Sequence, residues 1–378
     1  MKVSDTRQMP RIATSTVVKA GLVLFWARIG SLNGLENSAK SRFWHGWLGE
    51  RLPSADTIGK VSAQMKPEGL RTVIHNVYSC LKRNKALKGK HGFLVGVLDG
   101  HETSSSYWRH CSGCLTRKTS SGEQQYYHRN VTFMLADDRL QLLLDVEPQR
   151  PGEDEVAAAV RLLERVVRDY PRAFRLVMAD ALYAQADFIN FLVSHGKHAL
   201  VVLKDDRRDI YKDAMGLFNR QQPKPGQYRS RVCQWWDEQE LTSWPRVVVP
   251  MRVVRSLETY CEHGQTKISE WVWVTTLPVS EASTRAVVAL GHARWDIENH
   301  GFNELVNAWQ ADHVYKHHPV AIESFYLMAF IAYNLFHAFI DLNVKPALRI
   351  GRPDAFWART FSAEIHTDAF RSASNRAP

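Results

Sequence analysis

The sequence predicts an α/β protein in which a mixed sheet is flanked by helices, with an N-terminal helical unit and a β-rich insertion. Three observations predict this class. Apolar residues recur at helical spacing over residues 1–90. Short apolar runs then alternate with amphipathic stretches over residues 91–204. Residues 205–280 are rich in β-branched and aromatic residues with turns between them.

The composition is that of a folded protein with a basic excess. The 378 residues are 45% hydrophobic and 23% charged, which suffices for two or three packed units. Lys and Arg number 49 against 39 Asp and Glu, for a formal net charge of +10. Such an excess favours a polyanionic partner, because neutralising phosphates releases counterions. A basic enzyme without such a partner is the alternative.

Residues 1–90 are expected to form a small helical unit. The segment LPSADTIGKVSAQM (52–65) combines a Ser or Asp cap with a following helix. In the next segment, 69–87, apolar residues recur at helical spacing. They are Leu70, Val73, Val77 and Leu81.

The first strands of the predicted sheet follow this unit. The apolar run FLVGVLDG (93–100) predicts a buried strand with Asp99 at its C-terminal end. The stretch RNVTFMLADDRLQLLLDVE (129–147) predicts two strands joined at Asp137 and Asp138 as a hairpin.

Helices and strands alternate after the hairpin. Residues 152–170 predict a helix with acids in its first turn, and FRLVMADALYA (174–184) is an apolar run that ends at Asp180. A helix over 185–195 and a strand over 198–203 follow. The first three strands can form an antiparallel meander, and helical crossovers can add the later ones in parallel. This mixed sheet matches the ribonuclease-H-like fold.

The C-terminal part of the chain returns to helical character. Residues 281–345 are expected to complete the domain begun by residues 91–204, and 346–378 to form a loosely ordered tail. The apolar run 320–340 is long enough to span a bilayer. Glu, Asn and His interrupt it, which favours a buried helix. With no signal-peptide layout at the N-terminus, the sequence favours a soluble, cytoplasmic protein.

Three carboxylates are candidates for a metal site. Asp99 and Asp180 end predicted central strands, where a site can form, and Glu298 lies on the predicted helix HARWDIENHGFNEL (292–305). Phosphoryl transfer on DNA can use two Mg²⁺ ions, which need oxygen ligands from separate elements. The ordinary alternatives are loop starts for the aspartates and a surface ion pair with Arg294 for Glu298.

The chain resembles the DDE transposases of bacterial insertion sequences, in the group typified by insertion sequence four. The resemblance extends over about residues 54–332 and is carried by three motifs. They are VLDG at 97–100, MADALYA at 178–184 and RWDIENHGFNEL at 294–305. It implies a ribonuclease-H-like fold with a β-strand insertion between the second aspartate and the glutamate.

The resemblance also implies an activity, a cofactor and partners. Asp99, Asp180 and Glu298 would be the catalytic residues and would bind Mg²⁺, with Mn²⁺ as a substitute. The enzyme would cleave double-stranded DNA at the transposon's terminal inverted repeats and join the ends to target DNA. It would work as a homodimer in a synaptic complex, in the bacterial cytoplasm at the nucleoid and without a membrane. Residues 1–90 could bind the DNA ends.

The helix around Glu298 departs from the family's signature of Tyr, Arg, Glu and Lys. Arg294 and Glu298 fit this signature, but Gly291 and Leu305 stand at the Tyr and Lys positions. The departures leave two alternatives open. One is a catalytically inactive DNA-binding derivative, and the other is a ribonuclease-H-fold nuclease that cuts without joining.

Candidate DNA contacts lie on three segments. Arg294 could hold a phosphate one turn before Glu298. Trp295 could stack on an extruded base, as in the family, although core packing is the favoured interpretation. The other candidates are Lys204, Arg207, Arg208, Arg117, Lys118, His128 and Arg129. Rival candidates for stacking are Trp235, Trp236, Trp271 and Trp273.

The motif CSGC, from Cys111 to Cys114, is half of a zinc site. A complete site needs two more ligands, and the remaining cysteines are irregularly spaced. They are Cys80, Cys233 and Cys261. The favoured interpretation is therefore a loop between the first two strands with small buried thiols.

Overall fold

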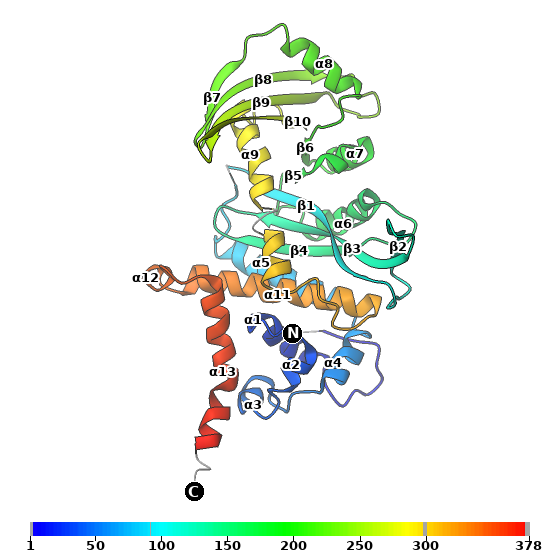
Figure 1. Cartoon of the computed structure of the whole chain (residues 1–378), viewed down its shortest axis with the longest axis vertical. Coiled ribbons are helices and arrows are strands. Elements are labelled where there is room, and N and C mark those ends of the chain that lie inside the picture. The colour runs from blue at the N-terminus through cyan, green and yellow to red at the C-terminus, as the bar shows by residue number, and fades with distance from the viewer. Residues whose placement is uncertain (1–2, 91, 298–300, 375–378) are drawn as a thin grey trace.

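The structure is a computed structural model that describes residues 3–90, 92–297 and 301–374. A mostly antiparallel ten-stranded sheet forms its upper part (Figure 1). The strands are β1 (Val95–Ser106), β2 (Leu115–Lys118), β3 (Gln124–Ala136), β4 (Gln141–Pro148), β5 (Leu176–Ala179), β6 (His198–Val202), β7 (Lys224–Tyr228), β8 (Arg231–Leu241), β9 (Met251–Glu262) and β10 (Gln265–Thr275). Their order is β2-β3-β1-β5-β6-β10-β9-β8-β7, and β4 pairs with β3.

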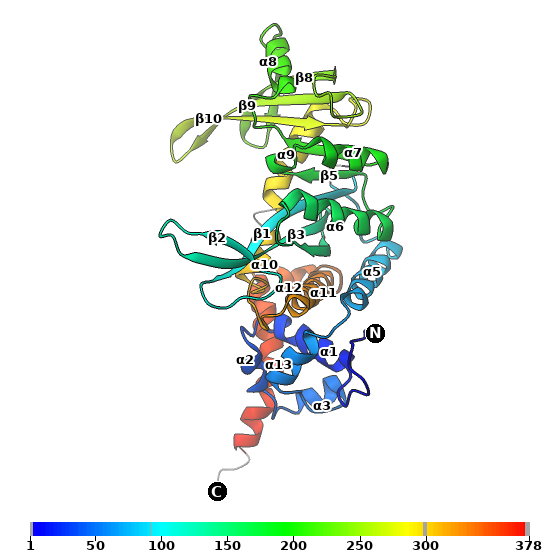
Figure 2. The ribbon, with the colours of Figure 1, turned by 90° about the vertical axis from the view of Figure 1, so that its right-hand side faces the viewer.

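Helices flank the sheet and form the lower part of the molecule (Figures 1 and 2). Those before and within the sheet region are α1 (Thr14–Trp26), α2 (Leu32–Glu36), α3 (Phe43–Leu48), α4 (Ala55–Ser62), α5 (Pro67–Arg83), α6 (Glu155–Asp169), the 3-10 helix η1 (Ala181–Tyr183), α7 (Ala186–Ser194) and α8 (Asp209–Phe218). The later ones are α9 (Thr284–Ile297), α10 (Asn303–Asn307), α11 (Pro319–Asn343), α12 (Pro346–Arg349) and α13 (Asp354–Ser374).

The predicted mixed sheet is confirmed. β1, β3 and β4 form the antiparallel meander, and β5 and β6 are added in parallel beside β1. The hairpin turn falls at Asp137 and Asp138, and α6 begins after Asp154, which caps it. The structure adds β2, which pairs with β3 in a hairpin that projects from the body (Figure 2).

The segment predicted as β-rich forms β7 to β10, which extend this same sheet. β10 pairs antiparallel with β6, so the four strands continue the sheet at its edge. In both views they lie at the end of the molecule opposite α1 to α4 (Figures 1 and 2).

Helix α11 lies between the sheet and the N-terminal helices, and packs on α1, α5 and β4 (Figure 1). By length and composition alone it could cross a membrane, but 72% of its apolar window is buried inside the protein. The polar residues that interrupt it have partners. Asn334 exchanges two hydrogen bonds with the backbone of Leu143 in β4, and Glu323 pairs with Arg71 of α5. The prediction of a buried helix is confirmed within the described residues.

The expectation of a loosely ordered tail over 346–378 is wrong for its main part. Residues 354–374 form α13, which packs against α1 and α3. Ala358 and Ile365, seven residues apart on one helix face, are buried, and the rings of Phe361 and Phe336 lie 5.9 Å apart. Charged residues interrupt the apolar ones along this segment, so the sequence pattern does not reveal the buried face. The face is buried by packing against α1, α3 and α11.

Candidate active site

Asp99 lies in β1, and Asp180 directly follows the neighbouring strand β5. β1 and β5 are parallel and place Val97 opposite Met178. The printed pairing ends there, and Asp99 and Asp180 each follow this last pair by two residues. Both carboxylates act electrostatically on Tyr183, so they lie near the same side chain. Asp99 lies inside β1 rather than at its end, because pairing with β3 continues the strand to Ser106. Both aspartates are half-buried, so they remain accessible.

Asp180 shapes the turn that follows β5. Its Oδ1 accepts a hydrogen bond of 2.8 Å from the backbone N–H of Leu182, which caps the short helix η1. The turn directs Tyr183 into the core, where its ring is fully buried. Burial raises the pKa of Tyr183 well above its usual value, and the nearby charges of Glu155, Asp99 and Asp180 raise it further. The phenol therefore stays protonated and acts as a hydrogen-bond donor.

Glu155 supports this site from the other face of β1. Its carboxylate accepts hydrogen bonds from Tyr183 Oη at 2.8 Å and from Arg129 Nε at 2.5 Å. It also lies flat against Gly100, where an added Cβ would come within 2.1 Å of the carboxylate carbon. Since neighbouring residues of a strand face opposite sides, Glu155 and Asp99 are separated by the sheet. Glu155 thus contacts the chain beside both aspartates.

Sequence reasoning missed this role of Glu155. It counted the residue among the acids that favour the first turn of a helix. The signal that could have been noticed is the glycine that follows Asp99, since Gly100 leaves room for a side chain from another element.

The prediction for Glu298 lies outside the described residues. Helix α9 ends at Ile297, directly before it. Phe302, four residues after it, packs beside His101, with ring centroids 6.4 Å apart. His101 follows Asp99 by two residues on β1 and so points to the same face of the sheet.

Arg294 is buried and Trp295 is exposed, whereas the sequence analysis expected Arg294 to face DNA and Trp295 to pack in the core. Trp295 is 54% exposed, so the interpretation that it packs in the core is wrong. Arg294 is only 7% exposed. The two side chains point about 100° apart around the helix, and α9 turns Arg294 toward the protein and Trp295 toward solvent. Trp295 is therefore the more accessible of the two for a ligand.

The two departures from the family signature have a steric explanation. A Cβ on Gly291 would lie 2.4 Å from the indole of Trp273, so no larger residue fits there without displacing that ring. Leu305 is buried in the core. Trp273 itself is buried and stacks on Trp271 at 5.9 Å, which removes it from the candidates for base stacking. Trp235 is buried as well.

The basic candidates are distributed over both exposed and paired positions. Lys204 is exposed and follows β6 at the edge where Asp180 follows β5. Arg207 is exposed and pairs with Asp205 at 3.0 Å. Arg208 lies over the ring of Trp244.

The remaining candidates lie on the β2–β3 hairpin. Lys118 is exposed, and Arg117 forms two hydrogen bonds with Glu102, at 2.6 and 2.8 Å. Arg129 is held by Glu155. His128 is buried and faces two cysteines, so in this structure it offers no surface to DNA.

Two surface features escaped sequence reasoning. Trp108, in the loop between β1 and β2, is 88% exposed. A cavity of about 500 Å³ lies between the β7–β8 turn and α9, and its charged lining residues are all basic. They are Lys90, Arg229 and Arg285.

Comparison with protein families decides the identity of the chain. The family described as "Transposase DDE domain" matches residues 101–335, which is more than half of the sequence. The chain belongs to this family. The matched range contains Asp180 and Glu298, and it begins two residues after Asp99. The family implies a ribonuclease-H-like fold, an enzyme of the transposase type and a DNA substrate, and its members typically use divalent metal ions.

Two other comparisons, with curated proteins and with solved structures, do not extend this family assignment. No curated protein matches the chain. Among solved structures, the NurA nuclease from Sulfolobus solfataricus is 14% identical, with 58% of this chain and 82% of that chain covered. Its TM-score of 0.27 is too low to carry an argument about fold or activity.

Proposed function

We propose that the protein is a transposase of the insertion-sequence-four-like group that cleaves DNA at transposon ends and joins the ends to target DNA. The observation that supports this proposal is the parallel pairing of β1 and β5 in a chain of the DDE family, because Asp99 and Asp180 each follow the last pair, Val97 and Met178, by two residues. Glu298 is the proposed third carboxylate. The packing of Phe302 on the Asp99 face of β1 supports it, because that contact ties the chain beyond Glu298 to this face.

The three carboxylates would hold Mg²⁺, because hard cations prefer oxygen ligands from separate elements. Two such ions, when bound, would neutralise the phosphodiester and activate the attacking hydroxyl. The contribution of the chain is to hold the donors in place. Glu155 contacts Gly100 next to Asp99, and through Tyr183 it fixes the turn that begins at Asp180.

DNA is proposed to cross the face that carries the aspartates. Lys204 and Lys118 are exposed and could contact phosphates, and Trp295 could stack on an unpaired base. The cavity lined by Arg229 and Arg285 offers a further basic surface beside α9. The formal net charge of +10 supports this assignment.

The assembly and its partners follow from the proposed reaction. Two transposon ends must be held together, so we propose a homodimer in a synaptic complex in the cytoplasm. The helices over residues 1–90 are proposed to bind the terminal repeats. Of these helices, α1 to α4 lie at the far end of the molecule from β7 to β10, so one chain could contact DNA over a long span (Figure 1).

A strand-transfer assay tests this function. Purified protein is mixed with labelled DNA that carries its element's ends, with Mg²⁺ or with EDTA. Joined products are expected only with Mg²⁺ and are expected to vanish in Glu298→Gln. Glu164→Gln, at an exposed position of α6, is the matched control and should join ends like the wild type.

The other outcomes select between the alternatives. DNA binding without cleavage in any metal would favour the inactive DNA-binding derivative. Cleavage that depends on Mg²⁺ but yields no joined product would favour a nuclease. Mn²⁺ in place of Mg²⁺ is expected to support the reaction.

Gly100→Ala tests the support that Glu155 gives to the site. The new methyl group would overlap the Glu155 carboxylate and push it away from Tyr183 and Arg129. We expect cleavage to fall by about 10- to 100-fold, because a displacement near 1 Å suffices for such a loss. Adding Glu155→Ala removes the clash, so the double variant should lose less than the two single losses combined. Additive losses would contradict the proposed contact.

A further inference from the structure

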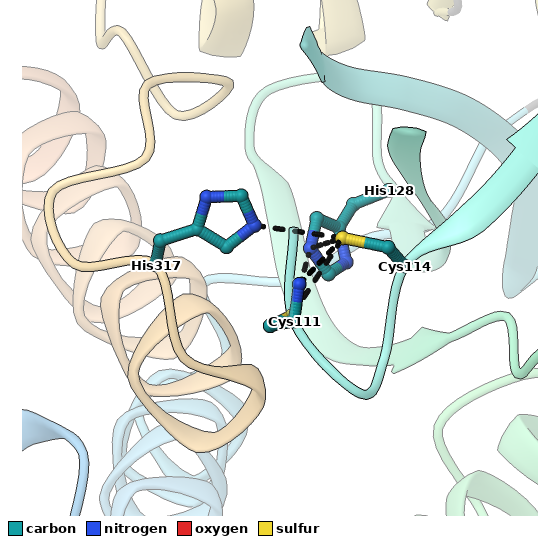
Figure 3. Close-up of side chains that lie close together, drawn as sticks. All are labelled: Cys111, Cys114, His128 and His317. Carbon is teal, nitrogen blue, oxygen red and sulfur yellow. Dashed lines mark hydrogen bonds between the residues drawn. The ribbon is translucent and has the colours of Figure 1, made fainter. Parts of the chain in front are cut away.

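Four potential metal ligands from three distant segments converge beside the β2–β3 hairpin (Figure 3). Cys111 and Cys114 come from the loop before β2, His128 lies on β3, and His317 precedes α11. Their ligand atoms all lie within 4.8 Å of one another. The half-site recognised in the sequence is thus completed by two histidines rather than by other cysteines.

Four of the six distances between the ligand atoms are close to those of one tetrahedral ion, and the other two are within 4.8 Å. The Sγ atoms of Cys111 and Cys114 are 3.7 Å apart. His128 Nε2 lies 3.4 and 3.3 Å from these sulfurs, and His317 Nε2 lies 3.5 Å from Cys114 Sγ. With Zn–S near 2.3 Å and Zn–N near 2.05 Å, a tetrahedral site requires about 3.8 Å between sulfurs and about 3.6 Å from sulfur to nitrogen.

The surroundings also suit a metal ion. The backbone N–H of Cys111 lies 3.2 Å from Cys114 Sγ and donates to it, which would stabilise a thiolate. His128 is buried, and its Nε2 faces both sulfurs. A sulfur separation of 3.7 Å is too long for a disulfide, where about 2.05 Å is required.

The cluster joins the loop before β2 and strand β3 to the segment that precedes α11. Gly113 lies against Pro319, the first residue of α11, and an added Cβ would meet its ring at 3.3 Å. An ion in the cluster would therefore fix the β2–β3 hairpin to the N-terminal end of α11. It would also anchor the segment that connects α10 to α11, at His317.

We propose that Cys111, Cys114, His128 and His317 bind one structural zinc ion, separate from the metal ions of the carboxylate site. Four protein ligands close the coordination sphere and leave no position for a substrate, which is typical of structural rather than catalytic zinc. Two thiolates and two imidazoles are soft and borderline ligands, which select zinc over Mg²⁺. The site is independent of the proposed transposition chemistry.

The zinc content of the full-length protein tests this proposal. The protein is produced in zinc-supplemented medium, purified without chelators and analysed by mass spectrometry for metals. We expect about one zinc per chain in the wild type and less than about a tenth of that in Cys111→Ser/Cys114→Ser. The matched control is Cys80→Ser/Cys261→Ser, which changes two exposed cysteines and should keep its zinc.

Two further measurements keep the test decisive if the cysteine variant misfolds. Wild-type protein loaded with Co²⁺ should show thiolate-to-cobalt charge-transfer absorption and tetrahedral ligand-field bands. Asp99→Asn/Asp180→Asn should retain zinc, which separates this site from the carboxylate site. A wild type without zinc, a double cysteine variant that retains it, or a Cys111–Cys114 disulfide in the purified protein would overturn the proposal.

Discussion

Asp180→Asn is expected to abolish DNA cleavage while leaving the fold and DNA binding intact. The substitution removes the negative charge of a proposed metal donor but keeps the shape of the side chain. The amide oxygen can still accept the hydrogen bond from the Leu182 N–H that caps η1. We expect cleavage to fall by at least about 10³-fold, equivalent to about 4 kcal/mol of transition-state stabilisation. Asp99→Asn should give a loss of the same order.

The measurement compares three quantities for each variant. They are the rate of cleavage of labelled transposon ends in Mg²⁺, the affinity for the same DNA, and the melting temperature. Asp206→Asn is the matched control, because Asp206 is exposed in the loop that follows β6 at the same edge. Cleavage by Asp180→Asn at the wild-type rate would contradict the carboxylate site.

Asp145→Ala is expected to cause the largest loss of stability. Asp145 is buried on β4 and accepts hydrogen bonds of 2.8 Å from Arg71 of α5 and from Arg165 of α6. Arg71 also pairs with Glu323 of α11 at 2.5 Å. Burial acts to lower the pKa of Arg71, but Asp145 and Glu323 outweigh it and raise the pKa. Removing Asp145 leaves two half-buried guanidinium groups short of a partner.

We expect the free energy of unfolding to fall by about 3–5 kcal/mol, the usual result of removing one partner of a buried ion pair. Denaturant unfolding followed by circular dichroism measures this change. Asp56→Ala is the control, because Asp56 pairs with Lys60 at 2.5 Å on the exposed face of α4 and should be nearly neutral. Equal midpoints for Asp145→Ala and the wild type would show that the network does not hold β4 to the helices.

Much of the fold could be predicted because local patterns coincide with its elements. The strands β5 and β6 and the first residues of β1 are short, buried apolar runs, and the helix α6 carries its own cap at Asp154. The tail did not follow this rule. In its helix α13, charged and hydroxyl-bearing residues interrupt the apolar ones, and its packing against α1 and α3 is not visible in a local pattern.

The sequence by itself determined the order of strands and helices, the basic charge and the two aspartates that follow apolar runs. Periodicity, charge and the distance between motifs along the chain carry this information. Only the tertiary structure decided which side chains contact one another and which are exposed. It set Glu155 beneath β1 against Gly100, exposed Trp295 and buried Arg294, and completed the Cys111 motif with His128 and His317. Those contacts join residues 14 to 206 positions apart, and such pairings depend on how sheet and helices pack in space.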